Sequence, residues 1–149
     1  MSTLVVPPEE PKFDDLYKEL ILDHYRYPHN RGVLEKPDVD MQQHNPVCGD
    51  EIRLTAIIKD GAISQIEFLG QGCAISQASA SMLTDRVKGL NLGDVDKLSI
   101  NFRDMLKGGK PDEQLMQDLM SLQGVSKYPI RVKCAVLAWD TLQKALGLK

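Results

Sequence analysis

Residues 52–68 read IRLTAIIKDGAISQIEF, and this stretch decides the expected fold. Apolar side chains stand at every second position from Ile52 to Ile58, which is the period of a strand with one buried face. A second, less regular alternation runs from Ile63 to Phe68. Between the two runs stands Asp60-Gly61, a dipeptide that favours a tight two-residue turn. The sequence therefore predicts an antiparallel hairpin.

Helical periodicity flanks the hairpin on both sides. Apolar residues three or four apart, small-residue runs and glycine or proline breaks predict helices at 13–25, 74–83, 95–106, 112–123 and 129–146. Residues 33–46 are polar and turn-rich, and Pro37 argues against a long helix there. The expected fold class is α+β, a small antiparallel β-sheet packed against helices on one side, with a helical insertion before the C-terminal helix. Proline-rich residues 1–11 predict a flexible N-terminal arm, and residues 12–149 a single domain.

Composition excludes several classes of protein. The 149 residues carry 18 Lys and Arg against 21 Asp and Glu, a net charge of −3, which argues against a general nucleic-acid binder. The longest strictly apolar run, Cys134 to Trp139, is far shorter than the roughly 20 residues that span a bilayer. The first fifteen residues lack the pattern of a secretory signal. We therefore expect a cytoplasmic protein with reduced thiols and no membrane or nucleic-acid partner.

The first candidate site residues are Cys48 and Asp50, which lie two apart in extended chain with Gly49 between them. At that spacing their side chains point the same way, so one short segment offers a thiolate and a carboxylate. Cys73 stands at the predicted junction of a strand and a helix, where a helix N-terminus favours the thiolate. The glycines just before it, Gly70 and Gly72, leave room for another group to approach.

The third thiol is Cys134, in the apolar part of the last predicted helix, with Arg131 and Lys133 within one turn. Each thiol also has a simpler explanation. Cys48 taken alone is typical of a small buried apolar residue. The glycines before Cys73 are also typical of an ordinary turn, and Cys134 of a residue on a core face.

Taken together, the three thiols and Asp50 number four, the count that a closed tetrahedral zinc site takes. Cys48 and Cys73 bracket the predicted hairpin, whose two ends must lie close together. His44 is a rival fourth ligand, four residues before Cys48. His24 and His29 are expected to make structural hydrogen bonds near the end of the first helix.

The chain resembles the U-type iron–sulfur assembly proteins, the IscU/SufU family, from about Phe13 to its end. The resemblance lies in ILDHY (21–25), PHNRG (28–32), NPVCGD (45–50), GQGCAIS (70–76) and RVKC (131–134). It implies an α+β fold and a site of three cysteines and an aspartate, which fall on Cys48, Asp50, Cys73 and Cys134.

The family has two branches, and this chain departs from the scaffold branch. Scaffold members carry a Leu-Pro-Pro-Val-Lys segment for an Hsp70-type chaperone and a histidine just before the last cysteine. Here residues 124–130 read GVSKYPI, and Lys133 stands in place of the histidine. The long stretch 89–123 is a further departure. These features resemble the SufU branch, whose members hold zinc and accept sulfur.

The resemblance therefore implies a zinc-dependent sulfurtransferase that takes persulfide sulfur from a SufS-type, pyridoxal-phosphate-dependent cysteine desulfurase for iron–sulfur cluster biogenesis. Cys48 is the expected sulfur acceptor, while Arg131 is expected to orient Asp50 or the released thiolate. The last cysteine as the sulfur carrier stays open. The alternative function is a scaffold that builds a [2Fe–2S] cluster, or holds Fe²⁺, on the same cysteines and passes it to other proteins. A third possibility is that a Zn²⁺ ion at these residues serves only to stabilise the fold.

Overall fold

The computed structural model describes residues 15–148. The expected arm at residues 1–11, and the expected helix start at Phe13, lie outside the described residues. The elements are α1 (Asp15–Arg26), β1 (Val39–Asn45), β2 (Asp50–Lys59), β3 (Ala62–Gln71), α2 (Ala74–Val87), α3 (Leu92–Leu106), α4 (Glu113–Met116), the 3₁₀ helix η1 (Gln117–Lys127) and α5 (Pro129–Ala145).

The predicted hairpin is confirmed as β2 and β3, which pair antiparallel up to Lys59 and Ala62. Asp60 and Gly61 take φ values of 54° and 76°, the positive pair that a tight hairpin turn needs. The register shifts between Ile57 and Ile58, where the apolar alternation of the sequence also becomes irregular. The turn therefore fixes which residues of β2 and β3 pair, including those at the far ends of the hairpin.

The sheet has a third strand, β1, that the sequence pattern did not predict. It pairs antiparallel with β2, from Val39 opposite Ala56 to Asn45 opposite Asp50, and gives the strand order β1-β2-β3. Its side chains alternate between exposed and half-buried along most of its length. Because an edge strand with polar residues on both faces lacks the apolar period, the pattern of residues 33–46 indicated only turns.

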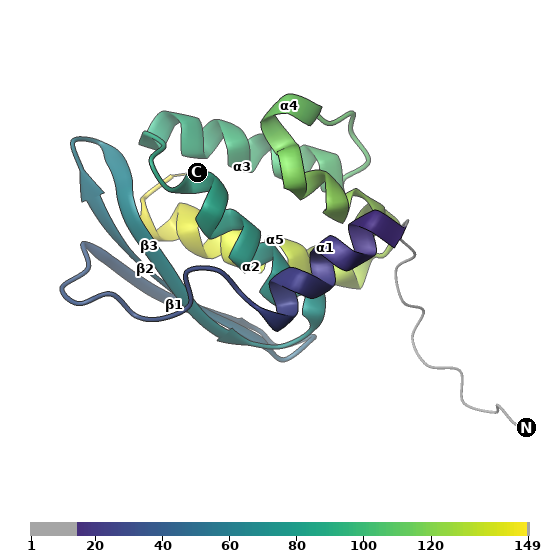
Figure 1. The fold of residues 1–149 in the computed structure, drawn as a ribbon, viewed down its shortest axis with the longest axis horizontal. Helices are drawn as coiled ribbons and strands as arrows, with labels where there is room; N and C mark the ends of the chain where they lie inside the picture. The colour runs from purple at the N-terminus through teal and green to yellow at the C-terminus, as the bar shows by residue number, and fades with distance from the viewer. Residues whose placement is uncertain (1–14, 149) are drawn as a thin grey trace, which may run out of the picture.

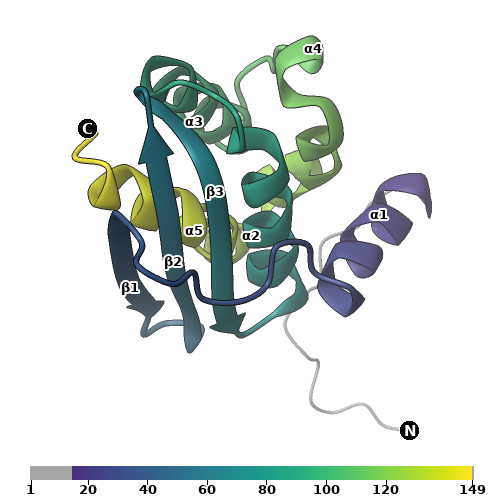
Figure 2. The same ribbon diagram turned by 60° about the vertical axis from the view of Figure 1, so that its left-hand side comes forward.

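The helices cover one face of the sheet, as the sequence predicts. Helix α5 packs on β1 and β2, helix α2 packs on β3, and α1 lies against α2 (Figures 1 and 2). The segment between α1 and β1 crosses the opposite face (Figure 2), where the Leu34 N–H donates to Thr55 Oγ1 at 3.1 Å. The predicted α+β class is confirmed.

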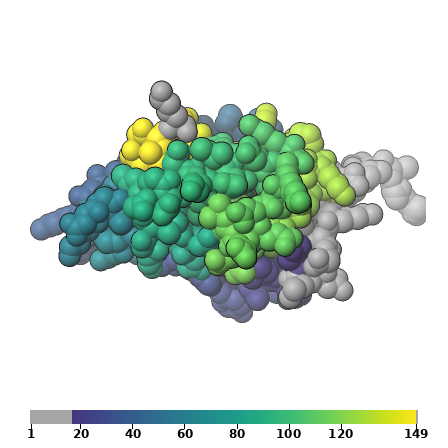
Figure 3. All heavy atoms as spheres, turned by 90° about the horizontal axis from the view of Figure 1, so that it is seen from above, coloured from purple at the N-terminus to yellow at the C-terminus, as the bar shows by residue number. Residues whose placement is uncertain are grey.

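The helical insertion before α5 is present, but the single helix expected at 112–123 is wrong in detail. Helix α4 has only 4 residues and ends where Gln117 takes a φ of 49°. The chain then continues as the 3₁₀ helix η1 as far as Lys127. Residues of α3 and of this insertion form much of the face seen in Figure 3.

Helix α2 lies at the centre of the core, and small side chains allow its neighbours to approach closely. Ala78 and Ala80 are fully buried, and so are the polar residues Ser79 and Ser81. Ser79 Oγ donates to the Ala135 carbonyl of α5 at 2.6 Å and accepts from Trp139 Nε1 at 3.1 Å. One buried hydroxyl of α2 therefore satisfies two polar groups of α5.

None of the helices described between residues 15 and 148 is long and apolar enough to cross a membrane.

Two buried serines give a test of this packing. We expect Ser79→Ala to lower the free energy of unfolding by about 1–3 kcal/mol, because it leaves the Trp139 indole N–H buried without its acceptor. Ser99→Ala is the matched control, since Ser99 is fully buried and its hydroxyl has no partner among the described residues. Urea unfolding of both variants should show a loss for the first alone, and equal losses would contradict the assignment.

Candidate metal centre

The four candidate ligands come from three parts of the fold that meet at one end of the sheet. Cys48 lies in the loop between β1 and β2, and Asp50 is the first residue of β2. Cys73 is the N-cap of α2, two residues after β3 ends. Because Glu51 pairs with Gln71, the start of β2 lies beside the end of β3. Cys134 lies in the second turn of α5.

The side chains converge closely. Ligand atoms of Cys48, Asp50 and Cys134 all lie within 4.8 Å of one another. The two sulfurs of this group are free thiols with 2.9 Å between them. Cys73 Sγ lies 3.9 Å from Asp50 Oδ2 and is hydrogen-bonded with the Cys134 thiol, so the third sulfur adjoins the cluster.

The Asp50 carboxylate is fully buried and held in place by the backbone. The Cys73 N–H donates to Asp50 Oδ1 at 2.9 Å. Gly72 takes a φ of 146°, and a Cβ on it would lie only 2.1 Å from the same oxygen. The close approach that the glycines before Cys73 predict is therefore made by Asp50.

The surroundings shift the pKa values of the Cys73 and Cys134 thiols in opposite directions. The hydrogen bond with the Cys134 thiol, helped by the Ser76 backbone N–H at the start of α2, lowers the pKa of Cys73 to about 6. The same hydrogen bond, together with burial, raises the pKa of Cys134 well above its usual range. The thiolate form of Cys73 is therefore favoured, as is usual for a thiol at a helix N-terminus.

The donor set fits a borderline or soft metal ion. Three sulfurs and one carboxylate oxygen are ligands that Zn²⁺ and iron accept, and Mg²⁺ and Ca²⁺ do not prefer. A fully buried carboxylate is also costly unless it is hydrogen-bonded, paired or bound to a cation. Cys48, Asp50 and Cys134 form the group whose ligand atoms are mutually close, and Cys73 lies outside that group although its sulfur is 3.9 Å from Asp50 Oδ2.

The other predicted residues are placed as follows. Arg131 is half-buried in the first turn of α5, three residues before Cys134. His44, the rival ligand, is exposed on β1 opposite Glu51. Among the described residues, the group of mutually close ligand atoms around Cys48 does not include it.

Asn45 is a further residue of the site that the sequence did not predict. Asn45 Nδ2 donates to Cys48 Sγ at 3.6 Å, and Asn45 Oδ1 accepts from the Val47 N–H at 3.0 Å. The second bond closes a local turn of the kind that an asparagine side chain favours. The Asn45-Pro46 dipeptide could therefore have predicted this turn from the sequence. The amide shapes the loop and donates a hydrogen bond to the Cys48 sulfur.

The chain is similar to several known proteins. Residues 16–147 match the model of the NifU-like N terminal domain. The zinc-dependent sulfurtransferase SufU of Bacillus subtilis is 43% identical over 135 residues, which cover 90% of this chain and 91% of that protein. The iron–sulfur cluster assembly scaffold protein IscU of Streptococcus pyogenes is 38% identical, with 91% of this chain and 85% of that protein covered. A crystal structure of a candidate scaffold protein for the SUF system from Fervidobacterium islandicum superposes with a TM-score of 0.83 at 32% identity, covering 86% of this chain and 94% of that one.

The close approach of Gly72 to Asp50 gives a test of the centre. We expect Gly72→Ala to weaken Zn²⁺ affinity by about tenfold or more, because the added Cβ displaces the carboxylate. Competition with a chromophoric chelator measures the affinity.

Gly61→Ala is the control, since Gly61 also has a positive φ of 76° but open space around its Cβ position. It should cost about 1–2 kcal/mol of stability through backbone strain and leave Zn²⁺ affinity unchanged. Equal affinities in the two variants would show that the position of Asp50 does not matter for the metal.

Proposed function

The chain belongs to the NifU-like N-terminal domain family, and from this premise we propose that it is a zinc-dependent sulfurtransferase. Its substrate is the persulfide sulfur of a pyridoxal-phosphate-dependent, SufS-type cysteine desulfurase, and its product serves iron–sulfur cluster biogenesis in the cytoplasm. Cys48, Asp50, Cys73 and Cys134 hold the zinc, and Cys48 accepts the sulfur.

Two kinds of evidence favour sulfur transfer over the scaffold role. The relative with 43% identity is named a zinc-dependent sulfurtransferase. In addition, this chain has Lys133 before the last cysteine and the GVSKYPI segment at 124–130, where the scaffold branch has a histidine and a chaperone-binding motif.

The unequal anchoring of the four ligands is the observation that carries the choice of Cys48. Asp50 is fully buried on a strand, and Cys134 is fully buried in a helix. Cys73 Sγ accepts the Ser76 N–H that caps α2 at 3.5 Å. Cys48 is half-buried on a loop whose Gly49 has open space around its Cβ position. Cys73 is half-buried as well, so it is the loop position of Cys48 and its lack of a helix-capping role that make it the ligand a partner can displace at least cost.

The surface around Cys48 suits a protein partner. Val47 and Ile130 are large apolar side chains, and they are 61% and 58% exposed. Cys48 Sγ lies 4.0 Å from the Ile130 carbonyl, so both apolar residues flank the thiol. Exposed apolar side chains beside a reactive group are typical of a surface that a partner covers.

The transfer is an exchange between sulfurs. The Cys48 thiolate attacks the outer sulfur of the persulfide on the desulfurase, a new S–S bond forms on Cys48, and the old one breaks. The desulfurase cysteine leaves as a thiolate, so no outside oxidant or reductant is consumed. When Zn²⁺ is bound, it keeps its ligand thiols deprotonated at neutral pH. The Asn45 amide stabilises the charge on Cys48 before attack.

We predict that Cys48→Ala removes the stimulation of a purified cysteine desulfurase, while the thermal unfolding midpoint of the metal-free variant stays near that of the unchanged metal-free protein. The thiol is half-buried on a loop, so its loss creates no core cavity. Sulfide release from cysteine measures the stimulation. Mass spectrometry after alkylation should place the extra sulfur atom on Cys48 in the unchanged protein.

His44→Ala is the matched control, because His44 is exposed beside the site but is not among the proposed ligands. It should stimulate normally. Full stimulation by Cys48→Ala, or an extra sulfur found on Cys134, would contradict the assignment of the acceptor.

A scaffold function is the second candidate, favoured by the relatives named as IscU scaffold proteins. Three thiolates and a carboxylate are also ligands that an iron–sulfur cluster accepts. The two functions differ in what the protein holds at the end of its reaction, a persulfide or a cluster.

Anaerobic reconstitution with iron and sulfide separates the two functions. We expect the zinc-loaded protein to develop no stable visible chromophore, because its thiolates are already occupied. The colourless protein should still stimulate the desulfurase. A stable chromophore that passes to an apo-ferredoxin would establish the scaffold function instead.

A further inference from the structure

A second group of metal-binding side chains lies at the other end of α2. It comprises His24 near the end of α1, His29 in the segment that follows, and Asp85 in the last turn of α2. Cys73 and Asp85 are separated by twelve residues of one helix, or about 18 Å along its axis. The group is therefore separate from the thiol centre.

The three side chains already face one another. One ligand atom from each lies within 4.8 Å of the other two. The imidazole rings of His24 and His29 have their centroids 4.5 Å apart. His29 Nδ1 is also hydrogen-bonded to Asp85 Oδ2.

Hydrogen bonds fix the two histidines, as the sequence predicts, and also prepare them as ligands. Ser81 Oγ lies 2.7 Å from His24 Nδ1 and accepts the His29 backbone N–H at 2.8 Å. A ring nitrogen held by a hydrogen bond sets the orientation in which the other nitrogen meets a metal. His24 is buried, and burial followed by the proximity of His29 lowers its pKa, so the neutral form that binds metals is favoured.

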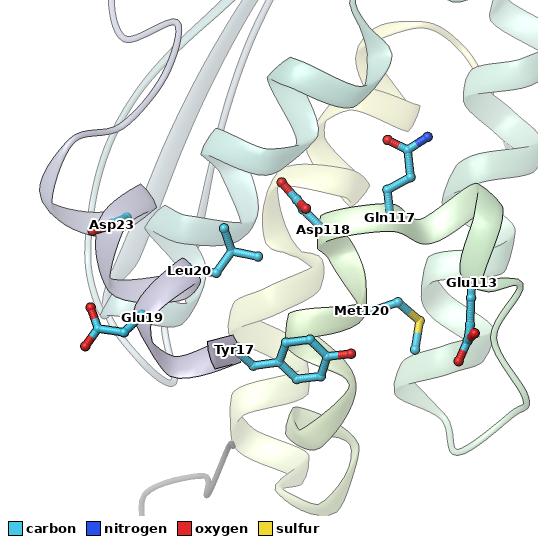
Figure 4. Close-up of a pocket in the computed structure, with 8 residues that line it drawn as sticks. All are labelled: Tyr17, Glu19, Leu20, Asp23, Glu113, Gln117, Asp118 and Met120. Atoms are coloured by element: carbon cyan, nitrogen blue, oxygen red, sulfur yellow. The ribbon is translucent and has the colours of Figure 1, made fainter. Parts of the chain in front are cut away.

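Polar and acidic groups around the cluster favour a cation. Asn30 Nδ2 donates to Asp85 Oδ1 at 3.0 Å and orients that carboxylate. Asp23 and Asp118 lie close enough to His24 to act on its pKa, and both line a groove of about 480 Å³ between α1 and the insertion. Figure 4 shows this groove, with Asp118 on the wall opposite α1. Glu19 and Glu113 add two further carboxylates to its lining.

We propose that His24, His29 and Asp85 form a second site, which binds a divalent first-row transition metal ion. Two imidazoles and a carboxylate are the ligands that Zn²⁺, Co²⁺ and Ni²⁺ accept. His29 and Asp85 have 51% and 42% of their side chains exposed, so both can adjust to the ion while buried His24 stays fixed. The acidic groove raises the local concentration of the cation.

Co²⁺ tests the site in protein that already holds one equivalent of Zn²⁺ at the thiol centre. The chain has three histidines, so the imidazole C–H signals in NMR report each residue separately. We expect the His24 and His29 signals to shift or broaden in a saturable way, while the His44 signal does not change. No saturable change at a large excess of Co²⁺, or an equal response of all three, would overturn the proposal.

Variants locate the ligands without touching the core. His29→Ala and Asp85→Asn should each weaken Co²⁺ binding by about tenfold or more. His44→Ala is the matched control and should bind Co²⁺ as the unchanged protein does. Unchanged affinity in both ligand variants would contradict the site. These outcomes do not depend on desulfurase stimulation, so the proposal and the sulfurtransferase assignment fail separately.

Discussion

The hydrogen bond from the Cys73 N–H to the buried Asp50 carboxylate is the contact on which the candidate centre depends. It joins the first residue of β2 to the N-cap of α2, and so ties the sheet to the central helix. Gly72 makes it possible, because any side chain there would overlap the carboxylate. A carboxylate with no exposed surface needs compensation from donors or a cation. The backbone supplies one donor, and a metal ion at the proposed centre would supply further compensation.

The fold was predictable where short-range chemistry decides the structure. The Asp60-Gly61 turn and the apolar alternation on either side need no distant contact, and the hairpin follows from them. Strand β1 was not predictable in the same way. It is held by pairing with β2, and its polar, half-exposed side chains carry no apolar period. The break at Gln117 was missed for a related reason, since no glycine or proline stands there to mark its positive φ.

Part of the candidate site could be predicted from the topology of the hairpin. The rest depends on tertiary packing, which the sequence pattern does not show. The ends of a hairpin must meet, so Cys48 and Cys73 were expected to lie close together. The contact in the structure is made by Asp50, two residues after Cys48, whose carboxylate accepts the Cys73 N–H. The place of Cys134 depends on how α5 packs across β1 and β2, which no local pattern encodes. The same holds for His29 and Asp85, which are 56 residues apart in the chain and meet only because α1 packs on α2.

The candidate ligands differ in how firmly the fold holds them, and this difference relates the fold to the proposed chemistry. A transfer site must keep its metal while one ligand leaves, so its ligands cannot all be equally fixed. Here the strand, the helix core and the helix cap fix three of them, through Asp50, Cys134 and Cys73. The fourth, Cys48, lies on a short loop bounded by Asn45 and by Gly49, whose φ of 74° allows a tight turn. A loop that is anchored at both ends and open in the middle lets one thiol exchange partners without disturbing the sheet or α2.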